Sequence, residues 1–485
     1  MDWTWPAFRL RAIAGNHDDA TVTLLVSGSN GRLFTLYSGE PCITMCQAPW
    51  RAQSTMKTRG KRRQVEIYSK GAARAERIVP VNAARLEAVG LRRMSAKARG
   101  YIAGGAGSER TIAANRAAFD NVRIIPRILA GNDERNLGVE IFGRRHELPF
   151  LLGPIGVLDL AHRNGDIIAA RAASAEGICF VASCQSSVTL EEIARQGGAG
   201  RRWFQLYCSS EIEISYSLAR RAEAAGYEAL VVTVDTTELG WRPRDLERSY
   251  LPFARGRGIA NYVSDPVFRS ITAPTQKTPM RSLASLIGAA ELLTHWPQGP
   301  YAALASWGRT VAEIQKFVSK FSHPMLSWDN LAAIKTCTSL PVVVKGVLHP
   351  DDARRAMEIG CDGLIVSNHG GRQVDGAIAA LDALPAIVSA VGGRIPVLFD
   401  SGIRTGSDVM KALCLGARAV LVARPYVYAI AIAGENGTRA LIRNLAAELD
   451  LTMGLCGQSD VAKLGPWLLS NTATGDARAT ISPRT

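Results

Sequence analysis

Short apolar runs recur along the chain from about residue 150, and longer stretches of mixed polarity separate them. The runs are rich in Val, Ile and Leu and do not alternate with polar residues, which is typical of strands in a parallel sheet covered on both faces. Eight runs fit this description: FLLGPIG (150–156), ICFVAS (178–183), RWFQLY (202–207), ALVVTVD (229–235), PVVVKG (341–346), GLIVSN (363–368), PVLFDSG (396–402) and AVLVAR (419–424).

The segments between these runs carry the pattern of amphipathic helices. In TLEEIARQG, PDDARRAMEIG and SDVMKALCLG, apolar residues recur at intervals of three and four, and a glycine that can end a helix follows. Eight strand and helix units predict an α/β fold, the closed (β/α)8 TIM barrel, over residues 150–470. An open doubly wound sheet is the alternative.

Other parts of the chain fall outside this repeat. About 105 residues separate ALVVTVD from PVVVKG, so we expect a long insertion between strands 4 and 5, at about 243–330. Residues 63–149 are expected to form a helical segment that packs on the barrel. We expect residues 1–62 to be a poorly structured basic extension and residues 471–485 to be a C-terminal tail.

The composition is that of a globular protein, because 47% of the 485 residues are hydrophobic and 21% are charged. No apolar run approaches the roughly 18 to 20 residues that cross a bilayer, and the start lacks the pattern of a secretory signal. We therefore expect a cytoplasmic protein without a membrane partner. Nine cysteines without CxxC spacing predict free thiols and no metal site.

The formal net charge of +14 is unevenly distributed, since residues 1–100 contain 17 Lys or Arg and 7 Asp or Glu. The excess is concentrated in RAQSTMKTRGKRRQ (51–64), which could be a flexible basic arm. No aromatic residues interleave these charges, so the pattern favours a solvated segment over a specific nucleic-acid site.

The carboxyl ends of the predicted strands carry the candidates for chemistry, because reactive groups of a parallel barrel lie there. The residues at these positions are Pro154, Ile155, Gly156, Ser183, Gln205, Tyr207, Thr233, Asp235, Lys345, Ser367, His369, Arg372, Asp400, Ser401, Gly402, Ile403, Arg404 and Arg424.

The stretch SNHGGRQ (367–373) combines a base with an anion-binding group. His369 can act as a base near neutral pH, and Asp235 could orient it and favour its protonated form. Arg372 can clamp a planar carboxylate with two hydrogen bonds. The glycines between them let the backbone turn sharply, which would bring both side chains to the same mouth.

Two further features indicate a cofactor. DSGIRTG (400–406) and ARP (423–425) supply a glycine turn, two arginines and a helix start, which together suit a phosphate group. Lys345 has no evident carboxylate neighbour, and it could hold a negative charge that develops on a cofactor ring.

These residues resemble the family of FMN-dependent α-hydroxy acid oxidases and dehydrogenases, which includes glycolate oxidase and the lactate monooxygenases. SNHGGRQ is close to the signature of that family, and the resemblance extends from about QVEIYSKG at 64 to DLTMGLCG near 457. It implies a flavoprotein oxidoreductase that uses FMN, with a small 2-hydroxy acid and O2 as reactants. It also implies a homo-oligomer, since barrels of this family commonly form tetramers.

The resemblance assigns roles to individual residues. His369 would take the substrate proton with Asp235 as its partner, and Lys345 would stabilise the reduced flavin. The substrate carboxylate and hydroxyl would be bound by Tyr101, Tyr207, Arg242 and Arg372. FMN would be held by Pro154, Ile155, Gly156, Ser183, Gln205, Thr233, Lys345, Ser367, Asp400, Ser401, Gly402, Ile403, Arg404, Ala423 and Arg424.

Within the family, LGWRPRDLERSYLPFARGRGIANYVSDPVFR (239–269), DSGIRTGSDV and Gly156 are similar to the lactate 2-monooxygenase branch. Glycolate oxidases have a side chain at the position of Gly156. This similarity implies oxidation of L-lactate to acetate, CO2 and water in place of pyruvate and H2O2. Ala423 stands where the family commonly has glycine, and Gln185 stands where glycolate oxidases have an aromatic residue, so the hydroxy acid stays open.

Other functions are compatible with the same residues. The flavin site could belong to an oxidase or dehydrogenase that releases the 2-oxo acid, with H2O2 or a quinone as the second product or acceptor. A barrel without flavin could use DSGIR and Arg424 to bind a phosphorylated metabolite. The basic arm could also contact nucleic acid beside an inert barrel.

Overall fold

A computed structural model describes residues 10–13, 23–27, 33–34, 58–72, 78–131, 134–272 and 283–471. The chain forms two compact units, 1–57 and 58–485. In the first unit, β1 (Leu10–Ile13), β2 (Thr23–Ser27) and β3 (Leu33–Phe34) form an antiparallel sheet in which Leu10 pairs with Val26. These strands lie within the predicted extension 1–62, where the sequence analysis expected no regular elements.

The second unit contains a closed barrel of eight parallel strands, which confirms the predicted fold. All eight predicted runs form its strands, and their central residues are fully buried because both faces of the sheet are covered. The strands are β7 (Phe150–Leu152), β8 (Phe180–Ser183), β9 (Arg202–Tyr207), β10 (Leu230–Thr233), β11 (Val342–Val347), β12 (Gly363–Val366), β13 (Val397–Phe399) and β14 (Ala419–Val422).

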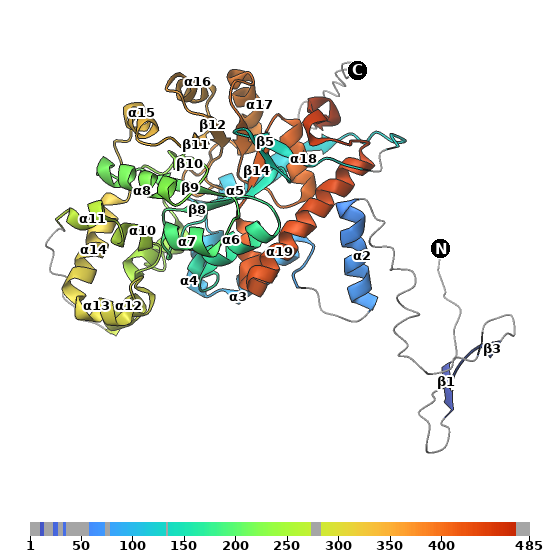
Figure 1. Ribbon diagram of the computed structural model, residues 1–485, viewed down its shortest axis with the longest axis horizontal. Coiled ribbons are helices and arrows are strands. Elements are labelled where there is room, and N and C mark those ends of the chain that lie inside the picture. Colours follow the sequence, from blue (N-terminus) through green and yellow to red (C-terminus); the bar gives the residue numbers. More distant parts are fainter. Residues whose placement is uncertain are drawn as a thin grey trace. The chain divides into compact units, whose positions relative to one another are not determined.

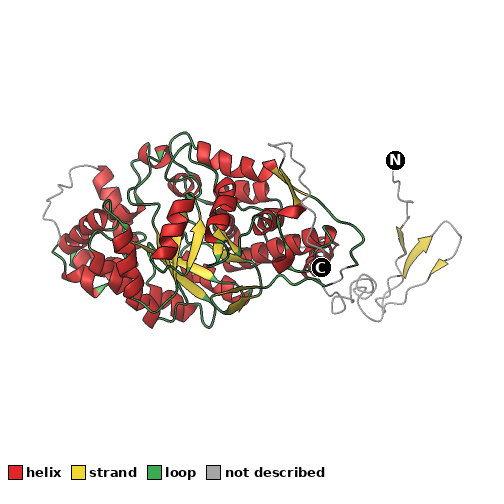
Figure 2. Cartoon of the chain, turned by 90° about the horizontal axis from the view of Figure 1, so that it is seen from above, coloured by secondary structure: helices red, strands yellow, loops and turns green. Residues whose placement is uncertain are grey.

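Helices surround this barrel in the order that the sequence pattern predicts (Figures 1 and 2). Each follows its strand and packs apolar residues against the sheet, and α18 begins at a capping box in which Thr405 and Asp408 bond each other's backbone. The helices are α6 (Gly165–Ala175), α7 (Leu190–Gln196), α8 (Ile212–Ala224), α15 (Trp328–Thr336), α16 (Pro350–Glu358), α17 (Ala380–Val391), α18 (Gly406–Cys414) and α19 (Arg424–Leu455).

The long connection between β10 and β11 is helical and has a small aromatic core of its own. The ring centroids of Phe253 and Phe317 are 5.1 Å apart, and those of Tyr262 and Phe317 are 4.8 Å apart. Figure 1 shows this insertion in yellow beside the barrel. Before α15 it contains α9 (Pro243–Leu246), η3 (Pro252–Arg255), α10 (Ala260–Val263), α11 (Pro266–Ser270), α12 (Leu283–His295), α13 (Pro300–Ala305) and α14 (Trp307–Lys320).

The segment before the barrel packs on it, chiefly against α19. It contains α2 (Arg59–Ala72), α3 (Ala83–Arg93), α4 (Ala96–Ala103), α5 (Arg110–Asn121), β4 (Val122–Ile124), β5 (Val139–Ile141) and β6 (Arg144–His146). Short elements complete the unit: η2 (Leu158–Leu160), η4 (Val461–Lys463), η5 (Pro466–Leu468) and β15 (Leu469–Asn471), which pairs with β4.

Helix α2 begins at Arg59 and therefore includes the end of the segment that the sequence analysis expected to be a flexible basic arm. Arg63 and Lys70 both bond the Glu66 carboxylate across successive turns, at 2.7 and 2.9 Å, which supports the helix. Four of the basic residues of 51–64 thus stand on a helix: Arg59, Lys61, Arg62 and Arg63.

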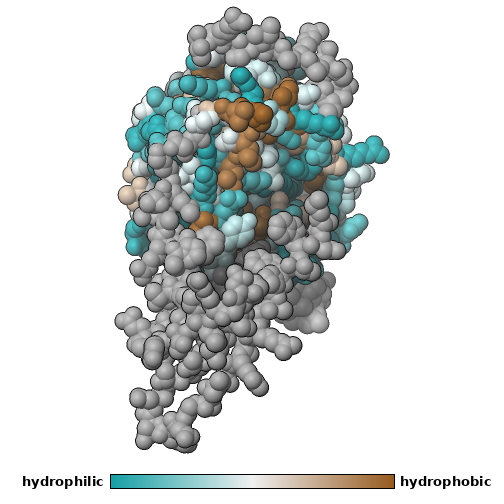
Figure 3. Space-filling model, turned by 90° about the vertical axis from the view of Figure 1, so that its right-hand side faces the viewer, coloured by the Kyte–Doolittle hydropathy of each residue, from teal (hydrophilic) through white to brown (hydrophobic). Residues whose placement is uncertain are grey.

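An apolar groove lies between α2 and the second half of α19, lined by Ile67, Val81, Leu451 and Leu455 among others. Figure 3 views the side of the molecule on which α2 lies in Figure 1, and apolar side chains form a band there among hydrophilic ones. No helix among the described residues is both long enough and apolar enough to pass through a membrane.

Candidate active site

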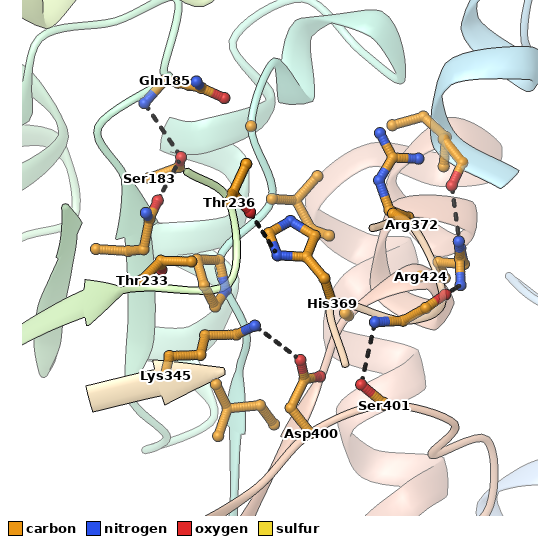
Figure 4. A pocket seen from close by; sticks show the side chains of 18 of the residues that line it. Ser183, Gln185, Thr233, Thr236, Lys345, His369, Arg372, Asp400, Ser401 and Arg424 are labelled. Atoms are coloured by element: carbon orange, nitrogen blue, oxygen red, sulfur yellow. Dashed lines mark hydrogen bonds and ion pairs between the residues drawn. The ribbon is translucent and has the colours of Figure 1, made fainter. Parts of the chain in front are cut away.

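One cavity lies at the carboxyl ends of the barrel strands and brings the predicted residues together (Figure 4). Of the residues predicted for the site, Asp235 and Ser367 alone do not line this cavity, and both are bonded to residues that do. Lining residues from the prediction are Tyr101, Pro154, Ile155, Gly156, Ser183, Gln205, Tyr207, Thr233, Arg242, Lys345, His369, Arg372, Asp400, Ser401, Gly402, Ile403, Arg404, Ala423 and Arg424.

His369 is held by two neighbours from the end of β10. Its Nδ1 lies 2.7 Å from Oδ1 of Asp235. It also lies 3.2 Å from Oγ1 of Thr236, as Figure 4 shows. On the other side of the ring, Nε2 lies 3.3 Å from the Tyr207 hydroxyl. Because Nδ1 faces a carboxylate, the proton of the neutral ring belongs on Nδ1, and Nε2 is the nitrogen free to accept a proton from a ligand.

The backbone at His369 adopts an unusual conformation that aims its ring at the cavity. His369, Gly370 and Gly371 have φ values of 58°, 63° and 76°. Three successive left-handed residues make a tight turn, and a non-glycine residue in this region is strained. The turn brings both His369 and Arg372 to the mouth, as the two glycines predict.

Burial lowers the pKa of His369 below its usual value by more than the Asp235 carboxylate raises it. Burial raises the pKa of Asp235, but its interactions with His369, which include a hydrogen bond, and with the Lys345 ammonium outweigh burial and hold that pKa below its usual value. The pair therefore combines an ionised carboxylate with an imidazole that is neutral near pH 7. A neutral imidazole is the form that can act as a base.

The side of the cavity next to His369 is cationic and rich in donors. Arg242 donates from Nε to the Arg372 carbonyl at 3.1 Å, and Arg372 donates to the carbonyls of Tyr101 and Gly104. Burial, together with the Arg372 charge, lowers the pKa of Arg242 to about 10, so it stays protonated at neutral pH. Burial also raises the pKa of Tyr101 and Tyr207, which keeps both hydroxyls as donors.

Lys345 does have a carboxylate neighbour, which corrects the expectation from the sequence. Its Nζ lies 3.1 Å from Oδ2 of Asp400, as Figure 4 shows. It also lies 2.9 Å from Oγ of Ser367. Burial lowers the pKa of Lys345, but the carboxylates of Asp400 and Asp235 outweigh it and keep the ammonium charged. The pairing was not evident from the sequence because Lys345 is on β11 and Asp400 follows β13. These two strands lie on either side of β12 in the barrel.

The wall formed by β8, β9 and β10 leaves polar atoms without partners. Ser183 Oγ donates to Gln205 Oε1 at 2.9 Å, whereas Gln205 Nε2 and Thr233 Oγ1 are buried and have no hydrogen-bond partner. Unpaired buried polar atoms are costly, so these two need a ligand with complementary groups. An isoalloxazine ring, whose edge carries carbonyl oxygens and ring nitrogens, meets that need beside the Lys345 ammonium.

The predicted phosphate cradle is assembled, but its arginines have protein partners. Arg424 at the start of α19 donates to the carbonyls of Ile102, Gly370 and Gly104 at 3.0, 2.9 and 3.1 Å. Its burial, with the nearby charge of Arg372 and Arg404, lowers its pKa to about 10. Two charged guanidinium groups and the Gly402 turn at one end of the cavity suit a phosphate dianion.

Five lining residues were not predicted: Ile102, Thr236, Leu239, Gly370 and Leu421. Gln185, noted in the sequence as part of the substrate wall, also lines the cavity. Thr236 and Gly370 adjoin predicted residues, so extending each strand end by one residue would have found them. Leu239, Ile102 and Leu421 are apolar, and the sequence holds no signal that distinguishes them from core residues.

Comparisons with known proteins agree with this geometry. A sequence model of the FMN-dependent dehydrogenase family matches residues 91–471. An FMN-dependent alpha-hydroxy acid dehydrogenase from Penicillium citrinum is 44% identical over 369 residues, which are 76% of this chain and 85% of the relative. An L-lactate oxidase from Lysinibacillus sphaericus is 38% identical over 385 residues, 79% of this chain and 91% of the relative. A crystal structure of mandelate oxidase is 36% identical, with a TM-score of 0.65 over 81% of this chain and 98% of that one.

Proposed function

The chain belongs to the family of FMN-dependent α-hydroxy acid oxidases and dehydrogenases, and from this membership we propose that it oxidises L-lactate with O2 to acetate, CO2 and water. FMN is its cofactor and a small 2-hydroxy acid its substrate class; the proposal concerns the particular acid and the products. The observation that carries the chemistry is geometric: the His369 imidazole, paired with Asp235, lies at the same cavity as the guanidinium groups of Arg242 and Arg372.

His369 acts as the base of the proposed reaction. Its Nε2 takes a proton from the substrate, and the imidazolium that results is stabilised by the Asp235 carboxylate 2.7 Å from Nδ1. FMN, when bound, accepts the two electrons that leave the substrate and passes them to O2. Lys345, kept charged by Asp400 and Asp235, stabilises the negative charge that this transfer places on the cofactor.

The substrate is positioned by its carboxylate. Arg242 and Arg372 present cationic groups at the mouth, and a planar carboxylate fits the fork of a guanidinium better than a point charge would. The hydroxyls of Tyr101 and Tyr207 donate to the carboxylate or to the substrate hydroxyl. Relatives named L-lactate oxidase support lactate as the acid.

Gly156 supports the decarboxylating outcome. A methyl group built on Gly156 would lie 3.1 Å from Oε1 and 3.3 Å from Cβ of Gln185. Glycine therefore leaves the space beside Gln185 at this wall of the cavity unfilled. We infer that pyruvate stays in the extra space until O2 has been reduced. Hydrogen peroxide then reacts with the retained pyruvate, which loses its carboxyl group as CO2 and leaves acetate and water.

The products of aerobic turnover with L-lactate test this proposal. Acetate, pyruvate and H2O2 are measured with and without catalase, because catalase removes any peroxide that has left the site. We expect acetate as the main product in both reactions. Pyruvate and H2O2 in equal amounts would instead assign the protein to the oxidases that release both products.

Gly156→Ala provides the matched variant. The added methyl group narrows the wall beside Gln185, so pyruvate should leave earlier and the products should shift towards pyruvate and H2O2. Gly308→Ala serves as the control, since a methyl group at Gly308 in α14 would meet nothing within 4 Å. An unchanged product ratio in Gly156→Ala would remove Gly156 from the explanation.

A further inference from the structure

The carboxamide of Gln373, the last residue of SNHGGRQ, joins two loops at the mouth of the cavity. Its Nε2 donates to the carbonyls of Asp235 and Glu238 at 3.0 and 2.8 Å. Its Oε1 accepts from Nη2 of Arg242 at 2.6 Å and from the backbone N–H of Gly240 at 3.3 Å. Both donor hydrogens and both acceptor positions of the amide are thus used.

These two loops carry the groups that the proposed function requires. The loop after β10 holds Asp235 and Arg242. The loop after β12 holds His369 and Arg372, which are labelled in Figure 4. Gly240 lies so close to the second loop that a methyl group on it would be 2.5 Å from the Arg372 carbonyl. The Gln373 amide therefore fixes the segment from Asp235 to Arg242, although Arg242 lies 131 residues before it in the chain.

We propose that Gln373 is a positioning residue that sets the Arg242 guanidinium against Arg372 and so fixes where the substrate carboxylate binds. This inference rests on the proposed function of the site. Gln373 does not line the cavity and acts through Arg242. Arg242 uses Nη2 for its bond to Gln373 and Nε for its bond to the Arg372 carbonyl. Neither of these bonds uses Nη1.

The neutrality of the amide matters as much as its geometry. Arg242 and Arg372 donate here to backbone carbonyls and to an uncharged amide, so their positive charges stay available for a substrate anion. A carboxylate in place of the amide would still accept from Arg242, but it would neutralise that charge. It would also face the carbonyls of Asp235 and Glu238 without a hydrogen to donate.

Two variants of the full-length holoenzyme separate this role from packing. Gln373→Glu keeps the shape and adds one negative charge beside Arg242, whereas Gln373→Met removes both kinds of hydrogen bond. We measure KM and kcat for L-lactate and the Kd of pyruvate for the oxidised enzyme, followed through the visible FMN spectrum. Val374→Ala is the control, because the neighbouring Val374 side chain is exposed.

We expect KM and the pyruvate Kd to rise about tenfold or more in Gln373→Met, as loss of a hydrogen bond to a charged group predicts. The rise should be larger in Gln373→Glu, and kcat should fall by a smaller factor than KM rises. A role in packing alone would lower FMN content and kcat and would leave the pyruvate Kd of the FMN-bound fraction unchanged. Equal binding by Gln373→Glu and the wild type would overturn the proposal, and so would an effect on kcat alone.

Two further outcomes are decided by the same experiment. If Gln373→Met is recovered without FMN, the KM and the pyruvate Kd of Gln373→Glu alone test the proposal, because that variant preserves the shape of the side chain. If L-lactate does not reduce the wild-type flavin, the proposed function fails. The pyruvate titration then still tests Gln373, since it measures anion binding without turnover.

Discussion

His369 lies between the carboxylate that orients it and the cavity where the substrate is proposed to bind. We expect His369→Ala to remain yellow with FMN and to lose flavin reduction by L-lactate by on the order of 10²-fold or more, because a positioned base is removed. Stopped-flow absorbance under anaerobic conditions measures this rate. His349→Ala, at an exposed histidine outside the cavity, should reduce normally. A His369→Ala rate near that of the wild type would contradict the role of base.

The same histidine determines how kcat/KM depends on pH in the acid range. Burial lowers the pKa of His369 below the ordinary 6.5. As pH increases, kcat/KM should therefore rise around that lowered pKa and stay level above it. It should fall again as pH approaches about 10, where Arg242 loses its proton and its hold on the carboxylate. Measuring kcat/KM from about pH 5 to about pH 10.5, with FMN retention checked at each point, gives the profile. An acid midpoint above pH 7 would contradict the assignment.

Helix α19 supports the site because it begins at Arg424, and it packs against α3. At Gly90 in α3, a methyl group would lie 2.5 Å from Cβ and 2.7 Å from Cα of Tyr428. Neither atom can move without shifting the α19 backbone. This crossing of the two helices therefore requires a residue without a side chain.

We expect Gly90→Ala to lower the free energy of unfolding by about 1–3 kcal/mol, the usual cost of overpacking. Urea denaturation measures the change. The control is Gly71→Ala in α2, where a methyl group would meet nothing within 4 Å, and alanine should stabilise that helix by up to about 1 kcal/mol. Equal effects of the two substitutions would show that the contact with Tyr428 does not determine the packing.

Strand positions were predictable to within two residues in six of the eight runs, whereas 150–156 and 396–402 extend four and three residues past β7 and β13. Contacts between strand ends were not predictable. The runs around Val343 and Ile365 are uniformly apolar, and this marks buried strands without reference to the rest of the chain. The pairing of Lys345 with Asp400 depends on which strands meet in space. The protein partners of Arg424 are backbone carbonyls, which leave no trace in the amino-acid sequence.

At the scale of the whole molecule, the sequence indicated the barrel, the insertion and the helical segment from residue 63, but not the elements that begin before it. The strands β1 to β3 are two to five residues long, too short for an alternating pattern to stand out. Helix α2 is rich in charge, with Arg63 and Lys70 on either side of Glu66. Such a segment resembles a solvated arm until its ion pairs and its contacts with α19 are known.

The barrel closes where β14 pairs with β7, with Val420 opposite Phe150. The residues that line the cavity come from segments spread from Tyr101 to Arg424, so a partly folded chain would lack a complete site for the cofactor. Long-range pairings of this kind form late and slowly. Uptake of FMN by the protein during refolding therefore reports the last step of assembly. Because FMN binds only the closed barrel, it shifts the population towards the folded state.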